Sequence, residues 1–170
     1  MSLHLIVDGY NVIRQVAGLQ AMDARDLEAG RGALLEMLAA YRKTRPAHKV
    51  TVVFDGWQGG ELQESRDRYL GLIVVYSRRG ERADEVIKRL LGREGRRAVV
   101  VSSDRELQTC ARDAGAAWVA AAQFARQYLE GAGDSPGENE ADISPPSGKK
   151  GPARRLPKQE RRRRQRLKKL

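Results

Sequence analysis

Four aspartates stand where apolar runs of the chain end, or where a helix begins after such a run. Asp8 ends the run LHLIV, Asp55 ends VTVVF, and Asp104 follows AVVVSS. Asp84 opens a helical stretch that comes after GLIVVYSRRGERA. Functional groups of open α/β sheets gather at the carboxyl ends of the strands, so we expect these carboxylates to meet at one edge. Their mutual repulsion would be severe there unless cations were bound.

Clustered carboxylates without His or Cys suit hard divalent ions, so Mg²⁺ or Mn²⁺ is the predicted cofactor. Two such ions about 4 Å apart can hold a phosphodiester, activate a water and stabilise the leaving oxygen. The pattern therefore indicates a nuclease. Each aspartate also has a structural alternative: Asp104 as a helix cap, Asp84 as a first-turn acid that matches the helix dipole, and Asp55 as a turn residue.

Other chemistries fit the same residues less well. An aspartyl phosphotransferase of the haloacid-dehalogenase type needs a second Asp two residues after the first, where this chain has Tyr10. The GxGxxG and GxxxxGK[ST] phosphate loops and the GxSxG nucleophile elbow are absent from the sequence.

The elements that position the aspartates are predicted from unbroken apolar runs, which are typical of strands buried on both faces of a parallel sheet. Helical patterns alternate with these runs, at about 26–43, 83–92, 103–115 and 121–131, with a short strand at 116–120. This alternation predicts a three-layer α/β/α sandwich with a mostly parallel sheet. The segment GWQGGELQESRDRY is interpreted as a loop.

Composition limits the setting of the protein. Cys110 is the only cysteine, so no internal disulfide forms, and it makes no zinc site with His4 and His48. A reducing, cytoplasmic location fits this composition best. No stretch approaches the roughly 20 apolar residues of a membrane helix, so no membrane partner is expected.

The positive charge of the chain lies at its carboxyl end. Residues 144–170 hold 12 Lys and Arg against one acid, whereas residues 1–143 hold 20 against 21. We predict a nuclease domain at 1–130, a flexible linker rich in Gly, Pro, Ser and acids at 131–157, and a basic tail at 158–170. The tail alone is expected to be disordered, to become helical against an anion, and to bind RNA without sequence specificity, unless it serves only solubility.

The motifs VDGYN, VVFDG, RADE and SSDRELQ, in this order, resemble the YacP-like branch of the NYN-domain family, whose fold is that of PIN nucleases. The resemblance covers about residues 3–130. It implies a metal-dependent endoribonuclease, and members of this branch are associated with ribosome-linked cleavage of messenger RNA.

Carried over by position, the resemblance implies a role for each motif residue. Asp8 and Asp84 are implied as core metal ligands and Asp104 as the third acid. Asp55 is implied as a supporting acid, and Asn11 as an amide that orients a ligand or phosphate. Alternatively, Asn11 caps the first helix. Glu85 either supports the metal ligands as an outer carboxylate or simply faces solvent.

RNA must reach these carboxylates, so local cations are needed around them. The candidates for phosphate contact are Arg14, Arg78, Arg79 and Arg82. Arg66 and Arg68 are weaker candidates, because a solvated charged loop accounts for them better. Trp57 is expected either to stack on an unpaired base or to cover the sheet edge, and Trp118 to lie in the core.

Two functions follow as hypotheses. The first is a cytoplasmic Mg²⁺- or Mn²⁺-dependent endoribonuclease that acts on RNA, with messenger RNA and the ribosome as partners. The alternative is a non-catalytic RNA- or ribosome-binding protein that acts through its basic tail, although a mere RNA-binding surface gains nothing from clustered negative charge. The oligomeric state stays open.

Overall fold

A six-stranded sheet forms the centre of the computed structural model, which describes residues 2–56, 61–130 and 158–170. Its strand order is β3-β4-β2-β1-β5-β6. The strands are β1 His4–Asp8, β2 Lys49–Phe54, β3 Ser65–Tyr69, β4 Leu72–Tyr76, β5 Ala98–Val101 and β6 Ala117–Val119. All neighbouring pairs are parallel except β3 with β4. The predicted α/β fold with a mostly parallel sheet is therefore confirmed.

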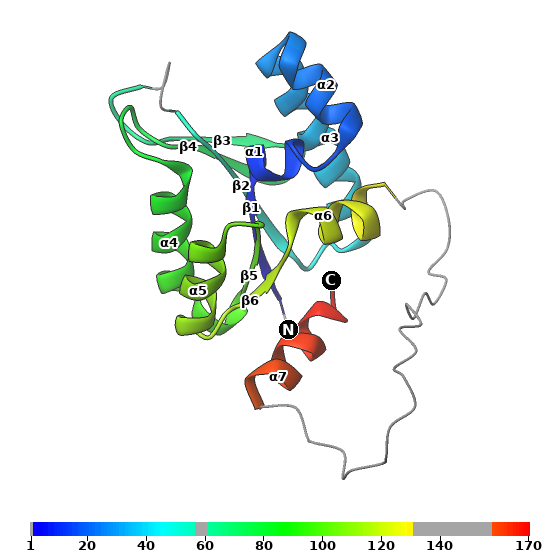
Figure 1. Cartoon of the computed structure of the whole chain (residues 1–170), viewed down its shortest axis with the longest axis vertical. Coiled ribbons are helices and arrows are strands. Elements are labelled where there is room, and N and C mark those ends of the chain that lie inside the picture. The colour runs from blue at the N-terminus through cyan, green and yellow to red at the C-terminus, as the bar shows by residue number, and fades with distance from the viewer. Residues whose placement is uncertain (1, 57–60, 131–157) are drawn as a thin grey trace, which may run out of the picture.

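Helices cover both faces of this sheet (Figure 1). They are α1 Gly9–Ile13, α2 Ala17–Arg25, α3 Leu27–Thr44, α4 Ala83–Glu94, α5 Arg105–Asp113, α6 Ala121–Phe124 and α7 Lys158–Leu167, with a 3₁₀ turn at Gly95–Arg97 (η1) and a π turn at Ala125–Leu129 (η2). Helices α4 and α5 lie on one face, and α1, α3 and α6 lie on the other. Among the described helices, none is both long and apolar enough to cross a membrane.

Alternate residues of each central strand feed two separate cores. In β1, Leu5 and Val7 pack with the α3 and α6 layer, whereas Ile6 packs with α4 and α5. All five residues of β1 are buried. A strand that is buried on both faces has no polar face, which is why its sequence shows no alternation.

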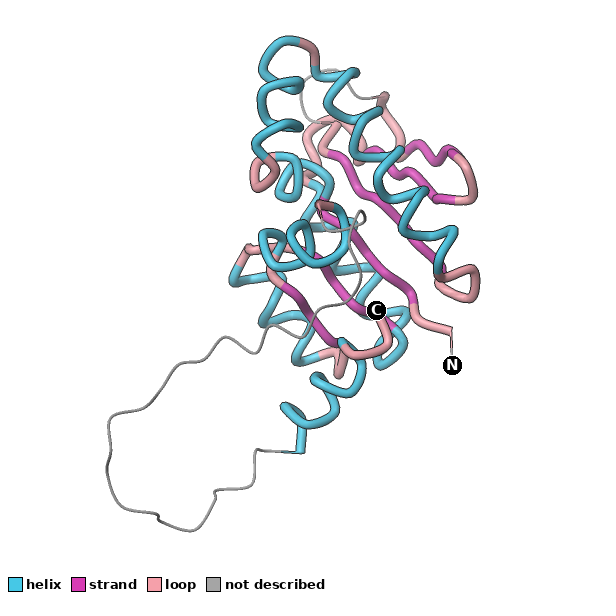
Figure 2. The backbone as a smooth tube through the Cα atoms, turned by 90° about the vertical axis from the view of Figure 1, so that its right-hand side faces the viewer, coloured by secondary structure: helices cyan, strands magenta, loops and turns pink. Residues whose placement is uncertain are grey.

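The carboxyl ends of β1, β2 and β5 meet at one edge because these strands run parallel and in close register. Asp8 lies opposite Val53 of β2, and Val7 lies opposite Val101 of β5. The residues that follow each strand therefore emerge at the same edge (Figure 2). This edge also receives the start of α4, which follows β4.

The interpretation of residues 56–69 as a loop is wrong for the last five of them. Ser65–Tyr69 forms β3, an antiparallel edge strand that pairs with β4. None of its five residues is buried, so it has no apolar pattern that a sequence could show. A two-residue turn of Leu70 and Gly71, both at positive φ, closes the hairpin, as type I′ turns require. Trp57 lies outside the described residues.

A second element without a sequence signal is α2. Leu19 is its only buried residue, and the helix has almost no apolar face. Instead, α2 packs closely on α3 at Gly30, where an added Cβ would lie 2.7 Å from Cβ and 2.8 Å from Cα of Asp23. The missing side chain of Gly30 thus lets the two helices approach.

The basic tail differs from the expectation of disorder without an anion, because it forms α7 and packs on the domain. The guanidinium of Arg163 lies 3.6 Å from the ring centroid of Trp118, and its Nε donates to the Trp118 carbonyl at 3.1 Å. Arg166 donates to the carbonyls of Arg96 and Gly115 at 3.0 and 2.8 Å, and Leu170 is buried. Helix α7 is thus held largely by stacking and hydrogen bonds of its arginines, and not by the apolar stripe that would make a docked helix recognisable in the sequence. The predicted linker, residues 131–157, lies outside the described residues.

Candidate active site

Asp8 lies at the centre of the site. It ends β1 and caps α1, and the residue is 8% exposed. Oδ1 accepts a hydrogen bond from the backbone N–H of Asn11 at 3.4 Å, and Oδ2 accepts one from the Ser102 hydroxyl at 3.1 Å. These two donors hold the carboxylate at the edge of the sheet.

The electrostatic setting of Asp8 disfavours its negative charge. Burial raises the pKa of this carboxyl from 3.8 to about 6, although the bonds from Ser102 and Asn11 oppose the rise. The like charges of Asp84 and Asp104 add to it. A carboxylate with a raised pKa near other acids is a common feature of functional sites and of cation sites in particular.

Asp84 and Asp104 enter the same site from two helix starts. Asp84 lies in the first turn of α4, 3.3 Å from the guanidinium of Arg82. Burial raises the pKa of Asp84, Arg82 lowers it, and Asp104 raises it again. Asp104 caps α5 by accepting from the amides of Glu106 and Leu107 at 2.7 and 3.2 Å. Asp84 is thus a first-turn acid and Asp104 a helix cap, as their structural alternatives state, and both also lie in the site.

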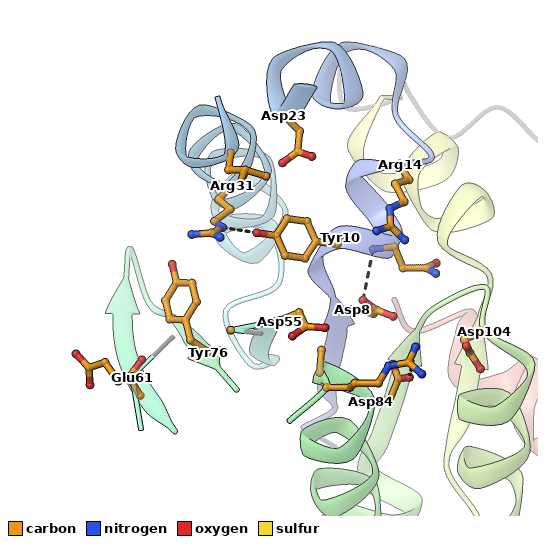
Figure 3. Close-up of a pocket in the computed structure, with 16 residues that line it drawn as sticks. Asp8, Tyr10, Arg14, Asp23, Arg31, Asp55, Glu61, Tyr76, Asp84 and Asp104 are labelled. Carbon is orange, nitrogen blue, oxygen red and sulfur yellow. Dashed lines mark hydrogen bonds and ion pairs between the residues drawn. The ribbon is translucent and has the colours of Figure 1, made fainter. Parts of the chain in front are cut away.

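One open cleft of about 820 Å³ brings the predicted residues together (Figure 3). All five predicted catalytic residues line it: Asp8, Asn11, Asp55, Asp84 and Asp104. They come from the ends of β1 and β2 and from the starts of α1, α4 and α5. Their convergence is a property of the parallel sheet, and their catalytic roles stay predictions.

The amide of Asn11 connects two strand ends. Its Oδ1 accepts a hydrogen bond from the backbone N–H of Ser103 at 2.8 Å. The alternative that Asn11 caps the first helix is wrong, because Asp8 is that cap. Asn11 instead ties α1 to the loop after β5, next to Ser102.

Asp55 follows β2 directly, and the next residue is held firmly. The N–H of Gly56 donates to Oγ of Ser77 at 2.9 Å, and that hydroxyl donates to the Glu81 carbonyl at 2.6 Å. The loop after β4 therefore supports the loop that carries Asp55.

The four predicted phosphate contacts divide into two groups. Arg14 and Arg82 line the cleft. Arg78 lies in a separate depression and pairs with Glu81 at 3.6 Å, and Arg79 does not line the cleft. Of the weaker candidates, Arg66 of β3 pairs with Glu64, which precedes the strand, at 2.7 Å. Arg14 and Arg82 are thus the two of the four whose position suits a backbone contact in the cleft.

Several cleft residues were not predicted from the sequence. Tyr10, Arg31 and Tyr76 form one wall, and Ser102 supports Asp8 from below. Tyr10 belongs to the motif VDGYN, and Ser102 to SSDRELQ, so both stood beside residues that were predicted. Arg31 lies inside a helix, 21 residues from Tyr10, and no spacing rule connects them.

The possible metal ligands in the cleft are carboxylate, amide and hydroxyl oxygens, which are the ligand types that hard divalent ions prefer. Within the described ranges, there is no group of three or more His, Cys, Asp or Glu side chains that could hold a metal ion by itself. Mg²⁺ usually takes only one or two carboxylates and completes its shell with waters and substrate phosphates. Asp8 and Asp84 fit this mode of binding.

A mostly parallel sheet whose carboxyl edge carries one buried and several half-buried acids in an open cleft defines the class of PIN-like domains, which are nuclease-like. Residues 5–169 match the model of the YacP-like NYN domain. The chain belongs to this family. The match extends through α7, well past residue 130, where the resemblance in the motifs ends.

Known relatives agree with this assignment. The chain is 33% identical over 88 residues to the uncharacterized protein YacP of Bacillus subtilis (strain 168), which is 51% of this chain and 49% of that protein. The matched region thus spans about half of the length of this relative. The crystal structure of a mutant of Rae1 (YacP) from Bacillus subtilis is similar with a TM-score of 0.59 and 26% identity, over 74% of this chain and 73% of that one. A second crystal structure of Rae1 (YacP) covers 99% of this chain and 81% of its own, with a TM-score of 0.61 and 24% identity, and supports the fold.

Proposed function

We propose that this protein is a cytoplasmic endoribonuclease that depends on Mg²⁺ or Mn²⁺ and hydrolyses phosphodiester bonds of messenger RNA in association with the ribosome. The observation that carries this proposal is the placement of Asp8. It is buried at the strand edge within electrostatic reach of Asp84 and Asp104, in a cleft open to solvent.

Three acids this close together destabilise the protein when no metal is bound, and they attract a cation when one is present. Each ionised carboxylate raises the free energy of the next, and burial removes the water that would screen them. Asp8 and Asp84, with Asp104 beside them, would hold the ion. A bound divalent ion would stabilise charge on the phosphate and lower the pKa of a water.

The protein's own residues would prepare the substrate. Arg14 and Arg82 offer guanidinium groups to the RNA backbone at the cleft. The side chain of Arg82 is 70% exposed, so it can exchange the Asp84 carboxylate for a phosphate oxygen. Ser102 and Asn11 keep Asp8 in one orientation, which reduces the reorganisation needed when the ion and the phosphate arrive.

The test is cleavage of a circular single-stranded RNA by the purified full chain, since only an endonuclease opens a circle. We expect cleavage with Mg²⁺ or Mn²⁺, none with EDTA, and a loss of at least about 100-fold in Asp8→Asn and in Asp84→Asn. Asp113→Asn is the matched control, because Asp113 is exposed at the end of α5, away from the cleft. Full activity in either cleft variant would contradict the assignment of the metal ligands.

A second arm of the experiment tests the ribosome. The same proteins are added to a messenger RNA with and without translating ribosomes, and the cut sites are mapped. Cuts that require ribosomes and Asp8 support the association with the ribosome. Equal cutting with and without ribosomes, at the same sites, contradicts it.

A non-catalytic RNA-binding role remains a second candidate, because α7 presents an exposed basic surface. The described exposed cations of this surface are Lys158, Arg161, Arg162, Arg164, Lys168 and Lys169. RNA binding that needs this surface, without cleavage in either arm, would favour this second function.

A further inference from the structure

The wall of the cleft that faces Asp84 and Asp104 is aromatic (Figure 3). Tyr10 of α1 and Tyr76 of β4 line it, and Phe54 lies behind them. The ring of Phe54 packs edge-on against Tyr10, with centroids 5.4 Å apart, and is stacked with Tyr76 at 5.7 Å. A Cβ on Gly9 would overlap the Phe54 ring, so the main chain of the motif packs directly on this cluster.

Arg31 of α3 is fixed over the same three rings. Its Nε donates to the Tyr10 hydroxyl at 2.7 Å, and its Cζ lies 5.5 to 5.8 Å from the centroids of Tyr10, Phe54 and Tyr76. Among the described residues, Arg31 forms no ion pair with a carboxylate. Both of its Nη groups therefore keep donors for a ligand, on a side chain whose position is already fixed.

The charges around this wall favour a neutral ligand over an anionic one. Asp23 and Glu61 line the cleft on the same side as Arg31. A phosphate placed there would meet these two carboxylates, whereas a nucleobase carries no charge and offers both N–H donors and acceptors. Aromatic and guanidinium planes are also the surfaces on which unpaired bases stack.

We propose that Tyr10, Arg31 and Tyr76 form a subsite for one unpaired nucleobase, next to the phosphodiester held at Asp8. This inference rests on the proposed function, because it assigns the base that accompanies the cleaved bond. The base stacks against the Tyr76 and Tyr10 side of the cleft and accepts hydrogen bonds from Arg31. RNA in a duplex keeps its bases stacked inside, so the subsite selects single-stranded RNA.

The test uses a set of RNAs in which one nucleotide at a time around the cut site lacks its base. With the wild-type protein, we expect one abasic position to lower kcat/KM about tenfold or more, and its neighbours to matter little. Tyr76→Ala and Arg31→Lys should each lower kcat/KM for the intact RNA by about the same factor. Neither substitution should lower kcat/KM for the abasic RNA any further. Arg31→Lys keeps the charge but lacks the planar fork of donors, so it separates hydrogen bonding by the guanidinium from charge attraction.

Tyr69→Ala is the matched control, because Tyr69 lies at the other end of the same hairpin and donates to Glu36 outside the cleft. This variant should keep the full sensitivity to the missing base. Equal cleavage of all abasic RNAs by the wild-type protein, or unchanged sensitivity in Tyr76→Ala and Arg31→Lys, would overturn the subsite.

A binding experiment separates this inference from the proposed catalysis. Asp84→Asn protein is titrated with RNA that carries 2-aminopurine at successive positions, and fluorescence is read. Strong quenching at one position, lost in Asp84→Asn with Tyr76→Ala, supports the subsite even if no RNA is ever cut. Bound RNA without a quenched position overturns the subsite even if wild-type protein cuts RNA.

Discussion

The hydroxyl of Ser102 lies 3.1 Å from Oδ2 of Asp8 and donates a hydrogen bond to it, across 94 positions of sequence. The same hydroxyl accepts a hydrogen bond from the N–H of Asp104 at 3.1 Å. Ser102 is fully buried, so neither bond is replaced by solvent. One serine thus connects the carboxylate of Asp8 with the backbone of Asp104.

Replacing Ser102 with Ala should therefore affect stability and cation binding together. The buried carboxylate of Asp8 and the half-buried N–H of Asp104 lose their partner, which predicts a loss of about 1–3 kcal/mol in the free energy of unfolding. Asp8 also becomes freer to rotate, so Mn²⁺ affinity measured by calorimetry should fall. Ser2→Ala removes only an exposed hydrogen bond to Ala47 and should change neither quantity. Unchanged Mn²⁺ affinity in Ser102→Ala would contradict the positioning role.

Asp8→Asn should stabilise the protein when no metal is present. Burial raises the pKa of Asp8 from 3.8 to about 6, so the ionised form costs about 3 kcal/mol above pH 6. Asn is uncharged, keeps one oxygen that accepts from the N–H of Asn11, and has an NH2 group that can donate to the Ser102 hydroxyl. We therefore expect a gain of about 1–3 kcal/mol in EDTA at about pH 8. The gain should decrease as the pH falls through about 6 and vanish below the ordinary pKa of 3.8, where wild-type Asp8 is protonated in both states. Urea unfolding at the two pH values measures it, and Mg²⁺ should raise the stability of wild type but not of Asp8→Asn.

His4 should make stability fall on acidification. Its Nε2 lies 2.8 Å from Oγ1 of Thr51, and burial, with a smaller effect of Lys49, lowers its pKa below the ordinary 6.5. The unfolded chain therefore binds a proton below pH 6.5 that the folded chain resists, and this contribution to stability is lost as the pH falls. The slope is at most about 1.4 kcal/mol per pH unit. The difference between wild type and His4→Gln isolates it from the opposite effect of Asp8, and parallel curves would refute it.

Gly30 and Gly32 offer a matched pair of substitutions in α3. An Ala at 30 meets the backbone of Asp23 at 2.8 Å and must push α2 away, which predicts a loss of about 1–3 kcal/mol. An Ala at 32 meets nothing within 4 Å and should stabilise the helix by about 0.5–1 kcal/mol. Thermal unfolding of both variants checks the pair. A neutral Gly30→Ala would show that α2 and α3 are not tightly packed.

The exposed cations of α7 should set the salt dependence of RNA binding. Changing Arg161, Arg162 and Arg164 to Gln should reduce the slope of log K against log salt by about 2 and leave the melting temperature unchanged, because Arg163 and Arg166 keep the helix docked. The control changes three exposed cations elsewhere, Arg25, Lys43 and Arg112, for the same loss of charge. An equal effect of both sets would mean that only net charge matters.

The parts of the fold that could be predicted are those whose residues are buried on a regular pattern. The runs that became β1, β2, β4 and β5 are apolar because both of their faces are covered. Strand β3 and helix α2 bury almost nothing, so their positions follow from pairing with β4 and packing on Asp23 and Gly30, which no local pattern records.

The same limit holds for the cleft. The meeting of the four acids Asp8, Asp55, Asp84 and Asp104 could be predicted, because each lies at or shortly after the end of a parallel strand of the sheet. Arg31 could not, since its place depends on how α3 crosses the sheet above Tyr10 and Tyr76. The docking of α7 was equally hidden, because it uses a guanidinium on an indole ring, and arginine-rich sequence is usually solvated.

Helix α7 docks near the amino-terminal starts of β5 and β6, whereas the cleft opens at the carboxyl ends of the strands (Figure 1). Residues 158–170 hold eight Lys and Arg and one acid, so the molecule is electrically polarised along its strands. A large polyanion would turn the protein until α7 rests on it. The cleft would then point outward, about 20 Å away, the length of a strand. Under the proposed function, α7 would bind one segment of RNA beneath the protein, and the cleft would cut another segment that approaches from outside.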